Sequence, residues 1–246
     1  MLFQIEVTTH CTFTCFYCAG RDMPQRHMAW PVLERILAHI PAGPHVVSLQ
    51  GEGEPTLHPR FWDMVAGVKA RGFLPTTITN GYEIDTARMA AELPNVAVSI
   101  DTLDEAEATR IGRLKLPRVL ASLDRLLATM GPERIRIMTV DYGQDLSALR
   151  NFLQQKGLRQ HIVQPLQRKE DYARRYPERV SAAGRYHCQC RFLQAPVMRF
   201  YDITGRELPC CFIKDTTAFT SIAALATDLA KGVVPPPCAG CREIMH

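Results

Sequence analysis

Apolar and polar residues follow two alternating patterns along the first two-thirds of the chain. Short apolar runs predict buried strands, and apolar residues three or four apart predict helices that cover them. The predicted strands are 3–8, 46–49, 76–79, 96–100, 135–140 and 161–164, and the predicted helices are 33–40, 61–68, 84–93, 119–130 and 146–155. Strands that alternate with helices predict an α/β fold with parallel strands, because right-handed crossovers join strands that run in one direction.

These elements make six strand–helix units if the loosest one is counted, which are too few to close an eight-stranded barrel. We therefore predict an open, partial (β/α)6 barrel over residues 1–165, with its active site at the carboxyl ends of the strands. Residues 166–186 mix basic and acidic side chains and predict a solvated linker, with contact to an acidic substrate as the alternative. Residues 187–246 are rich in cysteine and predict a small C-terminal domain.

Composition and charge narrow the class of protein. The chain has 246 residues, and 46% of them are hydrophobic, which suffices for a sizeable core. Its net charge of +4 does not indicate a nucleic-acid binder. No apolar run approaches the length of a membrane span, and the first residues lack the features of a signal peptide. We therefore expect a cytoplasmic protein without nucleic-acid or membrane partners, whose nine cysteines serve as metal ligands rather than disulfides.

Three cysteines lie close together directly after the first predicted strand. Cys11, Cys15 and Cys18 have the spacing Cys-x3-Cys-x2-Cys. Three thiolates at this spacing favour an iron–sulfur cluster, and they leave one iron of a 4Fe–4S cluster without a protein ligand. The alternatives are zinc, which usually needs a second pair of cysteines nearby, disulfides, which need an oxidising compartment, and three buried thiols.

This triplet, with Tyr17 just before its third cysteine, resembles the signature of the radical S-adenosylmethionine (SAM) superfamily. The resemblance implies that the open iron of a 4Fe–4S cluster binds the amino and carboxylate groups of SAM. An electron from the cluster then cleaves SAM to a 5′-deoxyadenosyl radical, which abstracts a hydrogen atom from a substrate. The resemblance also implies a partial barrel as the catalytic core and an electron donor such as flavodoxin or ferredoxin.

A glycine-rich run after the second predicted strand is a candidate for binding SAM. It extends from Gly51 to Pro55, and glycines at a strand end let a ligand approach the backbone closely. The run resembles the superfamily's GGE-type motif for the methionyl amino group, with Glu52 in place of the first glycine. The resemblance assigns this role to Gly53 and Glu54.

Four further candidates rest on position and on the resemblance together. Ser99 and Asp101 end the fourth strand and can reach a ribose, although Asp101 can instead cap a helix that begins at about residue 103. Asn80 follows the third strand, where Asn-Gly is also an ordinary turn. Tyr17 can pack on the adenine or merely on the barrel rim.

The remaining cysteines all follow residue 187. They are Cys188, Cys190, Cys210, Cys211, Cys238 and Cys241. Residues 197–201 and 207–209 predict a β-hairpin, which brings Cys190 and Cys210 toward one metal site. Cys238 and Cys241 complete a set of four thiolates, which suits zinc as well as an iron–sulfur cluster.

This layout resembles the SPASM/twitch extension of a subgroup of the superfamily. The resemblance implies one auxiliary 4Fe–4S cluster on those four thiolates, because the later cysteines of the two-cluster form are missing after Cys241. Adjacent residues of a strand point to opposite faces, so Cys211 is not expected to bind the same iron as Cys210. Cys211 and Cys188 keep no assigned role.

Two clusters in one chain imply an electron path. A substrate radical beside an alcohol or amine can pass an electron to an auxiliary cluster, which gives a two-electron oxidation. Chain size and cysteine layout resemble those of twitch-type dehydrogenases that act on the aminocyclitol 2-deoxy-scyllo-inosamine. We therefore expect a radical SAM oxidoreductase that oxidises a small hydroxylated or amino metabolite. The alternatives are a SPASM-type maturase, which would oxidise, crosslink or epimerise a ribosomal peptide, and a non-catalytic iron–sulfur or zinc protein.

The sequence identifies neither the substrate nor the base that removes the second proton. Tyr142, Gln164, Gln167 and Arg168 lie near the ends of the last two predicted strands and can face a substrate, although each also fits an ordinary loop. Many peptide maturases carry an amino-terminal peptide-binding domain, for which we expect no room before the first strand. That expectation favours a small molecule over a peptide.

Overall fold

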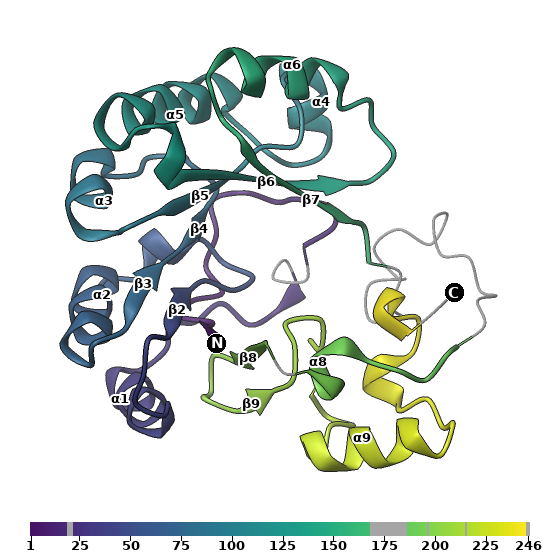
Figure 1. Ribbon diagram of the computed structural model, residues 1–246. Coiled ribbons are helices and arrows are strands. Elements are labelled where there is room, and N and C mark those ends of the chain that lie inside the picture. Colours follow the sequence, from purple (N-terminus) through teal and green to yellow (C-terminus); the bar gives the residue numbers. More distant parts are fainter. Residues whose placement is uncertain (19–21, 168–185, 196, 215, 245–246) are drawn as a thin grey trace.

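The computed structural model describes residues 1–18, 22–167, 186–195, 197–214 and 216–244. Most of the predicted linker, including Arg168, therefore lies outside the described residues. The chain forms an α/β fold with parallel strands, as the sequence predicts, and Figure 1 shows the strands on the inside with helices around them.

Parallel strand segments form a curved surface that we call the strand wall. They are β1 (Leu2–Ile5), β2 (Val46–Leu49), β3 (Leu74–Thr76), β4 (Ile78–Thr79), β5 (Val96–Ser99), β6 (Ile135–Asp141) and β7 (Gln160–Pro165). Hydrogen bonds join them into two sheets, with the orders β3-β2-β1 and β4-β5-β6-β7. Neighbouring strands are consecutive in sequence, as right-handed crossovers predict.

The third predicted strand, 76–79, is divided in the structure. Thr77 separates β3 from β4 and is fully buried. Its hydroxyl donates to the Leu49 carbonyl oxygen at 2.7 Å, and its own carbonyl oxygen accepts from the Ala97 N–H at 2.9 Å. Thr77 thus bonds to β2 on one side and to β5 on the other, which keeps the strand wall continuous across the two sheets.

Helices cover the outer side of the strand wall (Figure 1). They are α1 (Trp30–His39), α2 (Phe61–Ala70), α3 (Thr86–Glu92), α4 (Glu105–Arg110), α5 (Leu116–Met130) and α6 (Ser147–Gln155), with short 3-10 turns at η2 (Pro55–Leu57) and η3 (Pro132–Arg134). Each α-helix buries apolar residues, as α5 does with Val119, Leu123 and Leu126. The main apolar core lies between these helices and the strand wall.

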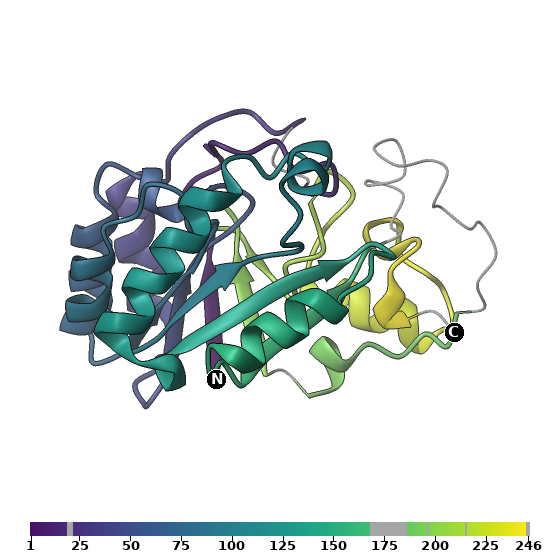
Figure 2. The same ribbon diagram turned by 90° about the horizontal axis from the view of Figure 1, so that it is seen from above.

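The C-terminal part of the described chain, residues 186–244, is the extension. It holds α8 (Arg191–Gln194), β8 (Met198–Tyr201), β9 (Glu207–Leu208), α9 (Ile222–Ala230), η5 (Pro236–Cys238) and η6 (Arg242–Ile244). β8 and β9 form the predicted antiparallel hairpin. β8 also pairs in parallel with β1, with Leu2 opposite Met198 and Ile5 opposite Tyr201. The hairpin therefore continues the sheet of the strand wall, beside which Figure 2 shows the extension.

None of the described helices combines the length and the apolar character that crossing a bilayer requires.

Candidate active site

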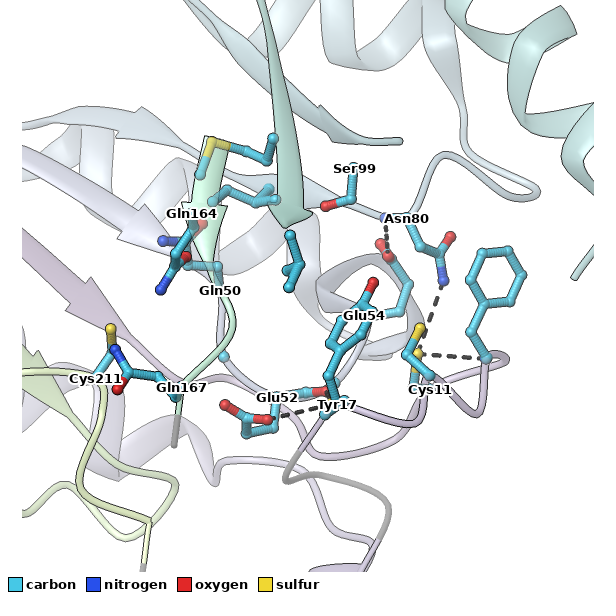
Figure 3. Close-up of a pocket in the computed structure, with 18 of the residues that line it drawn as sticks. Cys11, Tyr17, Gln50, Glu52, Glu54, Asn80, Ser99, Gln164, Gln167 and Cys211 are labelled. Atoms are coloured by element: carbon cyan, nitrogen blue, oxygen red, sulfur yellow. Dashed lines mark hydrogen bonds between the residues drawn. The ribbon is translucent and has the colours of Figure 1, made fainter. Parts of the chain in front are cut away.

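A cavity of about 360 Å³ opens on the inner side of the strand wall. The cysteine loop, the run after β2, and Asn80 and Ser99 line one part of it, and the extension contributes Cys211, Phe212 and Lys214. Figure 3 shows Cys11 and Asn80 on one side and Gln50, Gln164 and Cys211 on the other. Segments from both ends of the chain therefore share one cavity.

The cysteine loop is fixed by backbone contacts to the turn after α4. The Thr14 N–H donates to the Gly112 carbonyl oxygen, and the Phe16 N–H donates to the Ile111 carbonyl oxygen, both at 3.0 Å. Gly112 has a φ of +82°, and a Cβ there would lie 2.2 Å from the Thr14 carbonyl oxygen. Only glycine fits this close approach. The loop is therefore docked on the rest of the fold by its own backbone.

All three thiols of the loop line the cavity. The Cys11 Sγ accepts from the Phe13 N–H at 3.4 Å, and the Asn80 amide lies 3.8 Å from the same sulfur. Burial raises the pKa of Cys11 and of Cys15, so the protein alone favours the protonated thiols. A bound metal deprotonates its thiol ligands, and this donor set therefore suits a group that brings positive charge.

Within the residues that the structure describes, no three histidine, cysteine or acidic side chains converge closely enough to hold a single metal ion. A four-iron cluster suits thiols that are spread around a larger volume, because each cysteine binds a different iron. The residues of the loop fit such a cluster.

Gly53 packs against the cysteine loop. Its N–H donates to the Thr8 carbonyl oxygen at 3.2 Å, and the next residue, Glu54, donates its N–H to the His10 carbonyl oxygen at 2.8 Å. A Cβ on Gly53 would lie 2.5 Å from the carbonyl oxygens of both Thr8 and His10. The sequence analysis predicts that glycine at this position lets a ligand approach the backbone. In the structure, the group that lies against Gly53 is instead the protein's own backbone.

The Glu54 carboxylate is turned into the protein. One oxygen accepts from the Thr79 hydroxyl at 2.9 Å and from the Thr56 hydroxyl at 2.8 Å, and the other accepts from the Asn80 N–H at 2.6 Å. Burial raises the pKa of Glu54, while these hydrogen bonds lower it. Glu54 thus joins the end of β4 to the run after β2. It still lines the cavity, and its contact with SAM stays a prediction.

Asn80 is more than a turn residue. Its side-chain amide donates to the Thr12 hydroxyl at 3.2 Å, and its amide oxygen accepts from the Tyr82 N–H at 2.8 Å. Asn80 therefore links the end of β4 to the cysteine loop, beside which Figure 3 places it. Asn80 and Ser99 both line the cavity, as their predicted role requires.

Asp101 lies behind the cavity wall, with its side chain completely buried. One oxygen accepts from the Tyr17 hydroxyl and from the Arg113 Nε, and the other accepts from the Val140 N–H at 2.7 Å. The cavity lining does not include Asp101, so the structure gives the predicted ribose contact no support. The helix-capping alternative is wrong, because Asp104 caps α4 by accepting from the Glu107 N–H at 3.0 Å.

Arg113 was not identified from the sequence. Its Nη1 donates to the Ser99 carbonyl oxygen at 3.1 Å, and its Nε donates to the Tyr17 hydroxyl at 2.7 Å. Burial works to lower the pKa of Arg113, but the Asp101 carboxylate and then Tyr17 outweigh it and raise this pKa well above its usual value. Burial is also the main cause that raises the pKa of Tyr17. The signal was missing because a single arginine after a glycine looks like any loop residue.

The residues proposed to face a substrate divide into two groups. Gln164 and Gln167 line the cavity. Tyr142 does not, because it packs against Phe16 and its hydroxyl donates to the Glu107 carboxylate at 2.7 Å. Lys214 of the extension closes the far side of the cavity by an ion pair with Glu52.

The second cysteine group gathers inside the extension. Cys210 is buried in one small apolar cluster and Cys241 in another. Cys190 and Cys238 pack against both clusters, so the four predicted ligands surround one region. Cys211 lines the cavity and also packs against the cluster that contains Cys210. Both residues follow β9 in a turn, so the alternation of faces expected for a strand does not apply to them. Ligation of a cluster by the four predicted ligands stays a prediction.

Known proteins resemble this chain in sequence. The family model described as "Radical SAM superfamily" matches residues 5–155. A GTP 3′,8-cyclase of Edwardsiella ictaluri (strain 93-146) is 35% identical over 150 residues, which cover 56% of this chain and 45% of that protein. An S-adenosylmethionine-dependent nucleotide dehydratase of a Thermoplasmatales archaeon (strain ISO4-H5) is 32% identical over 116 residues, which cover 45% and 41%. The chain thus spans less than half of the length of these curated relatives.

Solved structures share the fold at low sequence identity. Streptococcus suis SuiB bound to S-adenosylmethionine aligns with a TM-score of 0.67 and 15% identity, over 96% of this chain and 66% of that one. BtrN in complex with AdoMet and 2-DOIA aligns with a TM-score of 0.56 and 14% identity, over 93% of this chain and 80% of that one. Both alignments include most of the extension as well as the strand wall.

Proposed function

Because the chain belongs to the radical SAM superfamily, we propose that it cleaves SAM reductively and uses the resulting radical to abstract a hydrogen atom from a substrate bound in the cavity. The observation that carries this proposal is the placement of Cys11, Cys15 and Cys18 at one side of a cavity of about 360 Å³. We interpret the strand wall as the partial (β/α)6 barrel that the sequence predicts.

Cys11, Cys15 and Cys18 would hold the 4Fe–4S cluster, and the run from Gly51 to Glu54 would receive the methionyl end of SAM. A bound cluster of this kind supplies the electron that cleaves SAM. The protein's own contribution is position. Backbone contacts fix the cysteine loop, Glu54 fixes the run after β2, and Asn80 and Ser99 present polar groups beside both.

The buried group formed by Tyr17, Asp101 and Arg113 would act as a brace for this site. Arg113 reaches the Ser99 carbonyl oxygen, and Tyr17 belongs to the cysteine loop itself. One carboxylate, Asp101, holds both. The loop and the end of β5 are thereby fixed to each other, so the cluster and the ribose end of SAM would keep a constant separation.

The substrate we propose is a small hydroxylated or amino metabolite, which the enzyme oxidises. Cys190, Cys210, Cys238 and Cys241 would hold an auxiliary 4Fe–4S cluster of the twitch type, which supplies an electron acceptor when bound. The gathering of these thiols in the extension supports it. BtrN, whose fold aligns over 93% of this chain at 14% identity, was solved with AdoMet and 2-DOIA, and this likeness concerns the fold. A cytoplasmic location and a flavodoxin or ferredoxin as electron donor belong to the same proposal.

A peptide maturase is the second candidate. SuiB, whose fold matches 96% of this chain, was also solved bound to the precursor peptide SuiA. At 15% identity this likeness concerns the fold, so it keeps the candidate open without favouring it over the first.

The test begins with protein reconstituted anaerobically with iron and sulfide, reduced with dithionite and supplied with SAM. We expect 5′-deoxyadenosine, measured by liquid chromatography and mass spectrometry. A variant in which Cys11, Cys15 and Cys18 are all Ala should make none, while a Cys188→Ala variant serves as the matched control. Equal cleavage in the triple variant and in the wild type would exclude the proposed function.

A further inference from the structure

Three glutamine side chains line the inner face of the strand wall, and the proposed cofactor site does not use them. Gln4 lies on β1, Gln50 directly follows β2 and Gln164 lies on β7. Gln4 is opposite Ser48 in the β1–β2 register, and Gln50 is two residues beyond Ser48. Since side chains two apart on a strand share a face, Gln4 and Gln50 lie on the same inner face. Figure 3 shows Gln50 and Gln164 at the same side of the cavity in that view.

Within the part of the chain that the structure describes, these carboxamides have few or no hydrogen-bond partners. The Gln50 side-chain oxygen is buried and has no hydrogen bond to any described residue. Turning the amide over would only place its nitrogen in the same situation. Gln4 is 8% exposed, and within the described ranges neither Gln4 nor Gln164 makes a side-chain hydrogen bond. Buried polar atoms are nearly always paired in folded proteins, so the Gln50 oxygen indicates a ligand, and the half-buried Gln164 and the buried Gln4 line the same cavity.

The charged side chains around the cavity indicate which class of ligand the cavity can bind. The cationic side chains of the described lining are Arg113 and Lys214, which pair with Asp101 and Glu52. A phosphate group is bound most strongly by an uncommitted cation, and the described lining also carries the carboxylates Glu52 and Glu54, which repel it. A carboxamide instead donates and accepts, as a hydroxyl group does.

The lining also contains apolar side chains. They include Ile78, Met138, Val140 and Leu166, and Val140 is the β6 partner of Gln164 on β7. A sugar or cyclitol ring has hydroxyl groups around its edge and C–H groups on its faces, so it matches a lining in which amides and apolar side chains are neighbours. The hydrogen that a radical abstracts is one of those C–H hydrogens.

We propose that Gln4, Gln50 and Gln164 form the substrate-recognition face of this enzyme, and that they select an uncharged, polyhydroxylated ring. This inference rests on the proposed function, whose substrate class it narrows. It makes phosphorylated substrates, such as those named for the cyclase and dehydratase relatives, poor ligands for this cavity.

Binding tests this inference independently of turnover. The full chain, loaded with iron and saturated with SAM, is titrated by ligand-observed NMR with scyllo-inositol, glucose, glucose 6-phosphate, GTP and a short alanine peptide. We expect the two neutral rings to bind, with glucose 6-phosphate and GTP no tighter than glucose. Gln50→Met and Gln164→Met should each weaken ring binding about tenfold, the loss of roughly one hydrogen bond.

Gln155→Met, an exposed glutamine on α6, is the matched control and should bind as the wild type does. Iron content and SAM affinity show that each variant is folded and loaded. Ring binding that is equal in Gln50→Met, Gln164→Met and the wild type would overturn the assignment, and so would tighter binding of GTP, glucose 6-phosphate or the peptide. Failure of the wild type to cleave SAM would count against the proposed function alone, because this experiment reads binding.

Discussion

The two cysteine groups of this chain are held by different forces. Around Cys11, Cys15 and Cys18, backbone hydrogen bonds and buried charges fix the loop from three sides. Around Cys190, Cys210, Cys238 and Cys241, the described contacts are mainly apolar packing in two small clusters. In the first group, Cys15 belongs to the large apolar core of the strand wall and Cys18 packs against that core, whereas the second group belongs to a short extension.

This difference predicts how far the folded shape of each site depends on a bound metal. The loop around Cys15 keeps its shape through Gly112, Gly53 and the Asp101 group, which need no ligand. Small domains with little core commonly take their stability from a metal, because binding energy becomes folding energy. We therefore expect the first site to be preformed and the extension to require its cluster.

The largest expected effect is that of Arg113→Met, which leaves Asp101 buried and without its cation. Removing one member of a buried ion pair costs about 3–5 kcal/mol, so the free energy of unfolding should fall by that amount. Urea denaturation followed by circular dichroism measures it. Arg110→Met is the control: Arg110 pairs with Glu107 at the surface, and we expect no measurable change. Equal effects of the two substitutions would contradict the bracing role.

The next largest effect is expected from removing two predicted ligands of the auxiliary cluster, and it should be confined to the extension. In Cys238→Ser/Cys241→Ser protein, iron content should fall by about half, from two four-iron clusters to one. Hydrogen exchange should rise in α9 and η6 of the extension and stay low in β5 and β6. The same variant should still make 5′-deoxyadenosine while losing product oxidation. Full iron content, or zinc in the native protein, would show that the four thiols hold no auxiliary cluster.

Gly53→Ala tests the close approach of the two loops. The added Cβ would lie 2.5 Å from the carbonyl oxygens of Thr8 and His10, so the backbone must move. We expect a loss of about 1–3 kcal/mol in stability, together with weaker SAM binding measured by calorimetry. Unchanged stability with weaker SAM binding would instead restore the interpretation that Gly53 leaves room for the ligand.

The smallest effect on metal content is expected from Cys211→Ala. Cys211 lines the cavity while Cys210 is buried in the extension, so iron content should equal that of the wild type. Cys210→Ala is the matched comparison and should lose the auxiliary iron. A loss of iron in Cys211→Ala and none in Cys210→Ala would exchange the two assignments.

The sequence predicted the strand wall and its helices because local apolar periods specify which residues are buried. It also predicted the hairpin, and the cysteine triplet with Tyr17 carried the resemblance to its family. It offered a helix from about residue 103 only as an alternative, where α4 begins at Glu105, and it missed the break at Thr77, where a polar side chain replaces strand bonding. The sequence leaves the roles of Asn80 and Asp101 open, because a polar residue at a strand end can bind a ligand, cap a helix or form hydrogen bonds inside the protein.

By itself, the sequence of this protein determined which side chains can bind iron and which segments can be strands, since both depend on residues that are near neighbours in the chain. Only the tertiary structure decided what these groups contact. Arg113 meets Asp101 and Tyr17 across 12 and 96 residues, and β8 pairs with β1 from opposite ends of the chain. The carboxylates of Glu54 and Asp101 can be buried because several hydrogen-bond donors meet each of them. Those donors come together only when the strand wall has formed.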